Sequence, residues 1–175
     1  MATVQISLEE YLRTSYHPDC DYVDGEVQER NLGEFDHGFI QVFLASWFFQ
    51  HRQDWQLHTV TEWRVRVSAG RVRIPDVCLV PSTEPVEPVL AKPPAAVIEI
   101  LSPEDRISRY HERLQDYRQM GVPNVWVIDP MQRVGYDCST AAWLPVDEFR
   151  IAGTPVYLQL GDLWSELDRV NRKQK

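Results

Sequence analysis

Large apolar residues recur at helical spacing in two stretches of the chain. Between residues 35 and 51 they fall every three or four positions, which predicts an amphipathic helix with one face to bury. A second helix is predicted after Ser102, because serine is a favoured N-cap residue and Pro103 suits the first helical position. Gly121 suits the end of that helix. Both helices need an apolar layer to pack against.

Short apolar runs of strand length supply that layer. The runs at residues 95–101 and 125–128 are almost entirely apolar, as expected of strands buried on both faces of a sheet. Residues 58–67 and 72–80 alternate apolar and polar side chains. We expect these two segments to form one antiparallel pair joined by residues 68–71.

The two ends of the chain carry weaker signals. Residues 8–12 predict a short helix with Ser7 as its N-cap, and the turn Asp24-Gly25 predicts a hairpin that needs no catalytic role. Five prolines mark residues 81–94 as a surface loop. Further strands and a turn of amphipathic helix are expected, in order, at residues 134–138, 142–144, 156–160 and 162–168.

Composition limits the class of protein. We expect residues 1–175 to form one domain, since a chain of this length buries most of its apolar surface. The net charge of -8 excludes a uniformly basic surface but is compatible with a locally positive cleft. Cys20, Cys78 and Cys138 form no CxxC pair, which indicates reduced, buried thiols. Without a signal peptide or a membrane-spanning run, a cytoplasmic protein is expected.

Two acidic residues interrupt apolar strand runs. Asp76 follows Ile74 and Pro75, and Glu99 lies within residues 95–101. Burying an unpaired carboxylate costs several kcal/mol, so each must have a partner. If the two strands are neighbours, Asp76 and Glu99 can converge on one divalent cation, with the Ile100 carbonyl as a third oxygen ligand. Oxygen ligation suits Mg²⁺ or Mn²⁺ rather than zinc.

The spacing leaves other interpretations open. Asp76 and Glu99 could instead form structural ion pairs with arginines of the helix that follows Glu99. Glu34, Asp36 and His37 begin the helix at residues 35–51, where they could compensate the helix dipole, or one of them could reach the metal site.

Four motifs between residues 75 and 130 form a recognisable combination: Pro75-Asp76, Glu99–Pro103, Tyr117–Val122 and Val125–Pro130, supported by Ser7–Leu12, Asp24–Glu26 and Leu160–Leu167. Together they resemble the Uma two family of restriction endonucleases, within the PD-(D/E)XK nuclease superfamily. The resemblance implies an α/β fold with a mixed central β-sheet flanked by helices, a Mg²⁺ or Mn²⁺ cofactor, and DNA as substrate. By position it implies metal ligation by Asp76 and Glu99, with His37 bordering the site.

Two positions depart from the family pattern. The superfamily lysine two residues after the glutamate is Leu101 here, and the helix position to which the family often moves it is Arg113. An aspartate of the family's helix corresponds to Arg109, with Asp105 one turn earlier. Arginine keeps the charge that stabilises a phosphate but cannot act as a general base.

These departures define the functional alternatives. The leading hypothesis is a metal-dependent DNA endonuclease in which Arg113 contacts the phosphate and Arg109 or Asp105 assists. The alternative is a catalytically impaired nuclease fold that binds nucleic acid or protein. Arg109 and Arg113, four residues apart, need an anion between them. That anion is a scissile phosphate, the Asp76 and Glu99 carboxylates, or helix partners in the pairs Asp105–Arg109 and Asp116–Arg113. A homodimer is compatible with either hypothesis.

Overall fold

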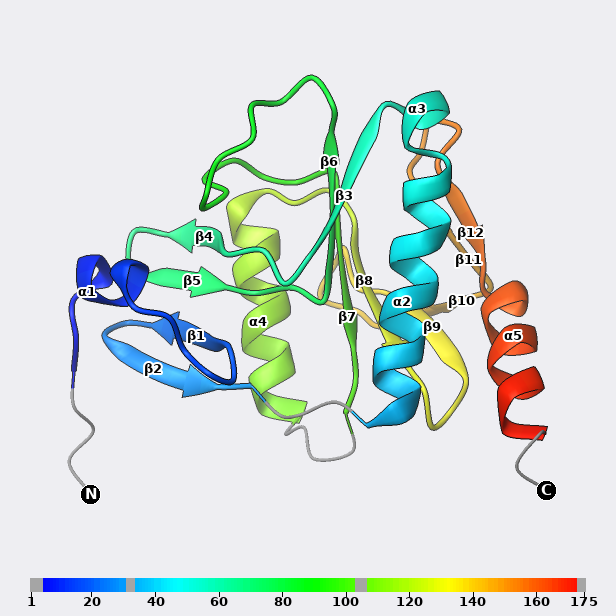
Figure 1. The fold of residues 1–175 in the computed structure, drawn as a ribbon, viewed down its shortest axis with the longest axis horizontal. Coiled ribbons are helices and arrows are strands. Elements are labelled where there is room, and N and C mark those ends of the chain that lie inside the picture. The colour runs from blue at the N-terminus through cyan, green and yellow to red at the C-terminus, as the bar shows by residue number, and fades with distance from the viewer. Residues whose placement is uncertain (1–4, 31–33, 103–106, 173–175) are drawn as a thin grey trace.

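The computed structural model describes residues 5–30, 34–102 and 107–172 (Figure 1). The molecule has three layers around a six-stranded sheet of order β10-β9-β8-β7-β6-β3. Helix α4 (Ile107–Met120) covers one face of the sheet, and α2 (Phe35–Gln50) and α5 (Leu160–Arg172) cover the other (Figure 1). This confirms the predicted α/β fold with a mixed central sheet flanked by helices.

The strands of the large sheet alternate their side chains between the two faces. Its members are β3 (Leu57–Thr61), β6 (Val77–Pro81), β7 (Ala96–Ile100), β8 (Val125–Asp129), β9 (Val134–Asp137) and β10 (Leu144–Val146). Leu79 and Ile98 pack towards α2 and α5, whereas Cys78 and Val97 pack towards α4. Strands β7 and β8 run parallel, and the other pairs are antiparallel.

A smaller sheet lies beside α4. It has the order β2-β1-β5-β4 and contains β1 (Cys20–Val23), β2 (Glu26–Glu29), β4 (Val65–Ser68) and β5 (Arg71–Arg73). Helix α1 (Leu8–Arg13) packs on it through Tyr11, next to Tyr22 and Val72. As predicted, Ser7 caps α1, since its side chain accepts a hydrogen bond from the Glu10 amide.

The expected antiparallel pairing of residues 58–67 with 72–80 is confirmed, but it is interrupted and divided between the two sheets. Strand β3 pairs with β6 in the large sheet, whereas β4 pairs with β5 in the small sheet. Glu62 adopts a φ of 53°, and Pro75 has no amide proton to donate. The strand pairing is therefore interrupted in both segments, at Glu62 in the first and at Pro75 in the second. The break separates the small sheet from the large one, so that the small sheet packs beside α4, and it places Asp76 directly before β6.

The remaining elements complete the layer of α2 and α5. The short α3 (Arg52–Trp55) follows α2. Strand β12 (Tyr157–Gln159) lies within the strand expected at residues 156–160, and it pairs with β11 (Glu148–Arg150), which the sequence did not suggest. Helix α5 is longer than the single turn expected, and it packs Leu163 and Leu167 into the core.

Two expectations from composition can be compared with the structure. All three cysteines are buried and unpaired. Within residues 5–30, 34–102 and 107–172, no helix has the length and apolar character needed to cross a membrane.

Candidate active site

Asp76 and Glu99 lie at the same edge of the central sheet. In the antiparallel pair of β6 and β7, Val77 lies opposite Ile98, so continuing the register by one residue sets Asp76 opposite Glu99. Directly opposed residues have Cβ atoms about 4.5–5.5 Å apart. The two side chains are almost fully buried, at 1% and 0% exposure. The structure therefore brings the two sequence-predicted carboxylates together.

The Asp76 carboxylate is held by three donors. Arg30 Nη2 lies 2.5 Å from Oδ1, the Ile100 amide donates to Oδ2 at 2.7 Å, and His37 Nε2 lies 3.4 Å from Oδ2. Burial by itself raises the pKa of Asp76, but the charge of Arg30 and the hydrogen bond from His37 outweigh it and lower the pKa to about 2. Asp76 is therefore an anion at neutral pH.

His37 lies in the first turn of α2, where the sequence also allowed a simple dipole role. Burial lowers its pKa, but the hydrogen bond and the negative charge of Asp76 raise it overall. The imidazole thus faces the carboxylate rather than only compensating the helix end.

Glu99 has two partners, both on α4. The Tyr117 hydroxyl donates to Oε1 at 2.6 Å, and Arg113 Nη1 donates to Oε2 at 3.0 Å. Complete burial raises the pKa of Glu99, and the nearby Asp76 charge adds to it, so that the pKa reaches about 7 although Arg113 opposes the shift. Glu99 therefore has the higher pKa of the two carboxylates and binds a proton more tightly than Asp76 does.

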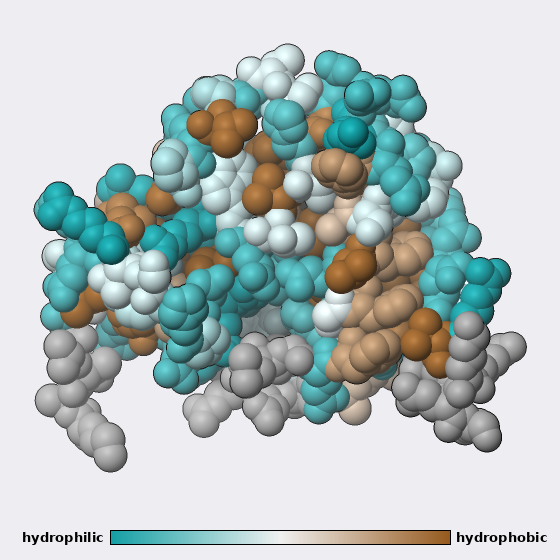
Figure 2. Space-filling view, viewed as in Figure 1, coloured by the Kyte–Doolittle hydropathy of each residue, from teal (hydrophilic) through white to brown (hydrophobic). Residues whose placement is uncertain are grey.

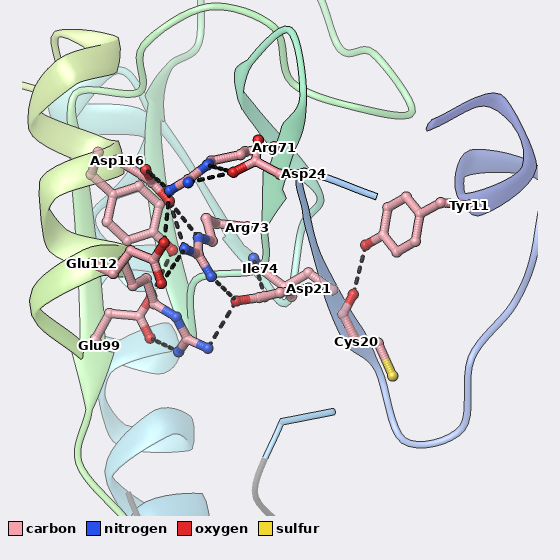
Figure 3. Close-up of polar contacts among 12 residues, drawn as sticks. Tyr11, Cys20, Asp21, Asp24, Arg71, Arg73, Ile74, Glu99, Glu112 and Asp116 are labelled. Carbon is pink, nitrogen blue, oxygen red and sulfur yellow. Dashed lines mark hydrogen bonds and ion pairs between the residues drawn. The ribbon is translucent and has the colours of Figure 1, made fainter. Parts of the chain in front are cut away.

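Arg113 joins Glu99 to the small sheet. Its Nη2 donates to Asp21 Oδ2 at 3.0 Å, so one guanidinium serves two carboxylates. Asp21 also accepts hydrogen bonds from Arg73 Nη1 and from the Ile74 amide (Figure 3). Burial raises the pKa of Asp21, but Arg113 and Arg73 lower it overall. Asp21 is a site residue that the sequence did not reveal, because it lies in a hairpin with no catalytic signal.

The network continues along α4 away from Glu99. Arg73, only 2% exposed, donates through Nε to Asp116 Oδ2 at 2.7 Å. Arg71 donates through Nη1 to Glu112 and Asp116 and through Nε to Asp24 (Figure 3). The alternative in which Asp116 neutralises Arg113 is wrong, because Asp116 faces the two arginines of β5 instead.

A small polar cavity lies between the small sheet and α4, and it is lined in part by Arg113, the partner of Glu99. Arg30, Arg109 and Arg113 line it together with residues of β1 and β2, and Arg109 is exposed to solvent. The position of Arg109 is compatible with an anion at the mouth of this cavity. Asp105, the proposed helper one turn earlier, lies outside the described residues, as does its pairing with Arg109.

The donor set at the sheet edge is chemically suited to a hard divalent cation. Asp76, Glu99 and the Ile100 carbonyl provide only oxygen atoms, and Tyr110 Oη donates to that carbonyl at 3.0 Å. No cluster of three or more His, Cys, Asp or Glu side chains able to hold a metal exists in the described part of the chain. Magnesium fits such a sparse site, because it is commonly held by one or two carboxylates together with water and substrate phosphate. Arg30 must leave Asp76 Oδ1 before that oxygen can bind it.

Comparison with known proteins places the chain in a family. Residues 8–134 match the model of the Uma2 family, described as "Putative restriction endonuclease". The protein belongs to the Uma2 family. This membership confirms the resemblance seen in the sequence and supports a nuclease. None of the curated proteins matches the Uma2 chain.

One solved structure supports the fold of this Uma2 protein. It is a "putative nuclease belonging to DUF820" from Anabaena variabilis ATCC 29413, with 18% identity and a TM-score of 0.72. The match covers 91% of this chain and 98% of the other. A DrdV–DNA complex is also similar, with 15% identity, a TM-score of 0.39, and coverage of 75% of this chain and 10% of the other. At 18% identity, the first of these likenesses establishes the fold.

Proposed function

We propose that this Uma2 protein is a metal-dependent DNA endonuclease that hydrolyses phosphodiester bonds at Asp76 and Glu99. The observation that carries the proposal is the placement of two buried carboxylates opposite each other at one end of β6 and β7, bound by Arg30 and Arg113, which line a polar cavity. Two neighbouring buried carboxylates whose pKa values are shifted in opposite directions are typical of a functional site.

Asp76, Glu99 and the Ile100 carbonyl are the groups that would hold Mg²⁺ or Mn²⁺. Bound there, the metal would lower the pKa of a water molecule and offset charge on the phosphate. The Ile100 amide fixes one oxygen of Asp76, and Tyr117 fixes one oxygen of Glu99, so that both carboxylates are oriented before any ligand arrives.

Arginines supply the positive charge for the substrate. Arg109 is exposed at the cavity mouth and is the residue placed to contact a phosphate oxygen directly. Arg113 contributes positive charge without touching the phosphate, because both of its terminal nitrogens already bind carboxylates. Preorganised donors of this kind contribute roughly 3–4 kcal/mol to transition-state stabilisation. Neither arginine can remove a proton from water.

A second candidate function has specific support. Arg30 on Asp76 and Arg113 on Glu99 are the structural ion pairs expected of a catalytically inactive site, although Arg30 directly follows β2 and does not come from the helix after Glu99. Under this alternative the protein keeps the nuclease fold and binds nucleic acid or another protein without cutting. The two functions differ in whether Asp76 and Glu99 bind a divalent cation.

The test combines cleavage and metal binding. Plasmid DNA is incubated with the protein and Mg²⁺ or Mn²⁺, and the same cations are titrated calorimetrically into the protein. The proposal expects cleavage that is lost in Asp76→Ala and Glu99→Ala but kept in Glu84→Ala, an exposed carboxylate paired with Lys92. Metal binding that is absent in the unmodified protein would favour the binding module.

Self-association is a further part of the proposal. Figure 2 shows apolar side chains gathered in a band over α2, and Phe35, Val42 and Phe49 are more than half exposed on that helix. Burying such a band between two copies is favourable. Sedimentation of the protein and of Val42→Glu tests whether a homodimer forms through α2.

A cytoplasmic location completes the proposal. Three buried, unpaired cysteines fit a reducing compartment in which DNA is accessible.

A further inference from the structure

A second cavity opens where β7 and β8 end, on the α4 side of the central sheet. Its volume is about 300 Å³, and it is distinct from the polar arginine-lined cavity. Because β7 and β8 run parallel, the carboxyl ends of both strands meet there, which is where α/β sheets bind ligands. The residues that line it are Leu101, Ser102, Tyr110, His111, Asp129, Gln132, Tyr136 and Trp143.

The walls of this cavity are aromatic and held in place. The rings of Tyr136 and Trp143 meet edge to face with centroids 5.5 Å apart. His111, a residue of α4, contacts Trp143 from another side, and the centroids of these two rings are also 5.5 Å apart. Trp143 is thus supported from two sides and only half-buried. A flat aromatic ligand would gain from stacking on such a surface.

One carboxylate provides polarity in this apolar setting. Asp129, at the end of β8, is 8% exposed, and its Oδ1 accepts a hydrogen bond from the Gln132 amide at 2.9 Å. Its Oδ2 has no hydrogen-bond partner within the described ranges. An aspartate oxygen accepts hydrogen bonds, so the group that it would recognise carries N–H donors at the edge of a ring. The amino groups of nucleobases have this character.

Tyr110 connects this cavity to the proposed catalytic edge. Its ring lines both cavities, and its hydroxyl donates to the Ile100 carbonyl. On one side of Tyr110 lie aromatic rings and an acceptor, and on the other lie Arg30, Arg109 and Arg113. This division matches the two chemically different halves of a nucleotide.

We propose that the aromatic cavity binds a single unstacked nucleobase of a DNA strand whose phosphate lies on the arginine side of Tyr110. The inference rests on the proposed nuclease function and adds a base-binding pocket to it. Trp143 and Tyr136 provide the stacking surface, and Asp129 accepts hydrogen bonds from the amino edge of the base. Enzymes that act on nucleic acids commonly hold an extruded base in this way.

The test uses a short single strand of thymidines with one central 2-aminopurine, whose fluorescence falls when the base stacks on an aromatic ring. The full chain is titrated into this probe in EDTA at low salt. We expect quenching on binding, and weakening of about tenfold or more in Trp143→Ala, because one base stack contributes that much to affinity. Asp129→Asn should weaken binding in the same assay.

Matched variants separate the pocket from general damage. Trp63→Ala removes a half-buried tryptophan from a cavity of similar volume that does not include Trp143, and Asp137→Asn removes a carboxylate that caps the Ser139 amide as Asp129 caps Gln132. Both should bind the probe as the unmodified protein does. Tyr136→Leu provides a second change in the aromatic wall, and thermal melting of all five variants checks that each one folds.

Three results would overturn the inference. They are the absence of quenching, equal quenching in Trp143→Ala and Tyr136→Leu, and equally tight binding of free 2-aminopurine deoxyriboside, which would indicate a small-molecule site. Because EDTA prevents metal-dependent cleavage, quenching does not depend on whether the protein cuts. Cleavage with unchanged quenching in Trp143→Ala would refute the base pocket and leave the nuclease proposal intact.

Discussion

Arg30 Nη2 lies 2.5 Å from Asp76 Oδ1. The guanidinium therefore occupies the position in which a metal ion bound to this oxygen would lie. The Arg30 side chain is 13% exposed and that of Asp76 is 2% exposed. Burial lowers the pKa of Arg30, but the charge of Asp76 raises it overall, so the pair stays ionised. Arg30 and a divalent cation therefore compete for one carboxylate.

This competition predicts tighter metal binding in Arg30→Ala. Removing the guanidinium leaves Asp76 buried and unpaired, which is unfavourable until a cation binds. We expect Mn²⁺ affinity to increase about tenfold, or about 1.4 kcal/mol, as measured by electron paramagnetic resonance titration. Arg13→Ala, which breaks an exposed pair with Glu9, is the control. Unchanged affinity in Arg30→Ala would show that Arg30 does not compete.

The raised pKa of Glu99 predicts a pH dependence of metal binding. At pH 6 Glu99 holds its proton, and at pH 8 it is ionised, since its pKa is about 7. Metal binding requires the ionised form, so Mn²⁺ affinity should rise between these values. Glu99→Gln should be weak at both.

The raised pKa of Glu99 also predicts that the metal-free protein becomes less stable as the pH rises. Because the pKa of Glu99 is higher in the folded chain than its ordinary 4.5, its protonated form stabilises the fold. That contribution is complete below about pH 4.5 and is lost as the pH rises through 7. Thermal melting without metal should give a lower Tm at pH 8 than at pH 6, and Glu99→Gln should reduce the difference. An equal drop in Glu99→Gln would assign the trend to other groups.

Tyr117→Phe tests the orientation of Glu99. The substitution removes the 2.6 Å hydrogen bond to Oε1, which acts to lower the pKa of Glu99. We expect the pH midpoint of Mn²⁺ binding to move upwards and the free energy of unfolding to fall by about 1 kcal/mol. Tyr22→Phe removes a similar bond to the Ile6 carbonyl away from the site and should leave the midpoint unchanged. A midpoint that does not move in Tyr117→Phe contradicts the role.

Arg73→Met tests the buried network. The substitution removes a guanidinium that is 2% exposed and leaves Asp21 and Asp116 with fewer partners. Breaking a buried pair costs roughly 3–5 kcal/mol, and we expect the lower value because Arg113 and Arg71 remain. Urea unfolding measures the loss, with Arg13→Ala at about zero as the comparison. A loss below about 1 kcal/mol would mean that the network adds little stability.

The sequence by itself determined the layers and the two central carboxylates. Helical spacing defined α2 and α4, and continuous apolar runs defined β7 and β8, because burial imposes these patterns locally. Alternation along the strands also placed Asp76 on the same face as Cys78, and Glu99 on the same face as Val97. In the structure, this is the face of the sheet that α4 covers. Local patterning could therefore place the carboxylates on the sheet.

Tertiary structure decided what those carboxylates contact. Arg30 meets Asp76 across 46 positions of sequence, and Asp21 meets Arg113 across 92. No local pattern specifies such pairs, because the sequence around a charged residue is the same whether its side chain faces solvent or a buried partner. The break at Glu62 and Pro75 brought the small sheet against α4 and so decided the partners. The sequence indicated where two buried charges lie, and only the packing of the small sheet beside α4 decided which arginines neutralise them.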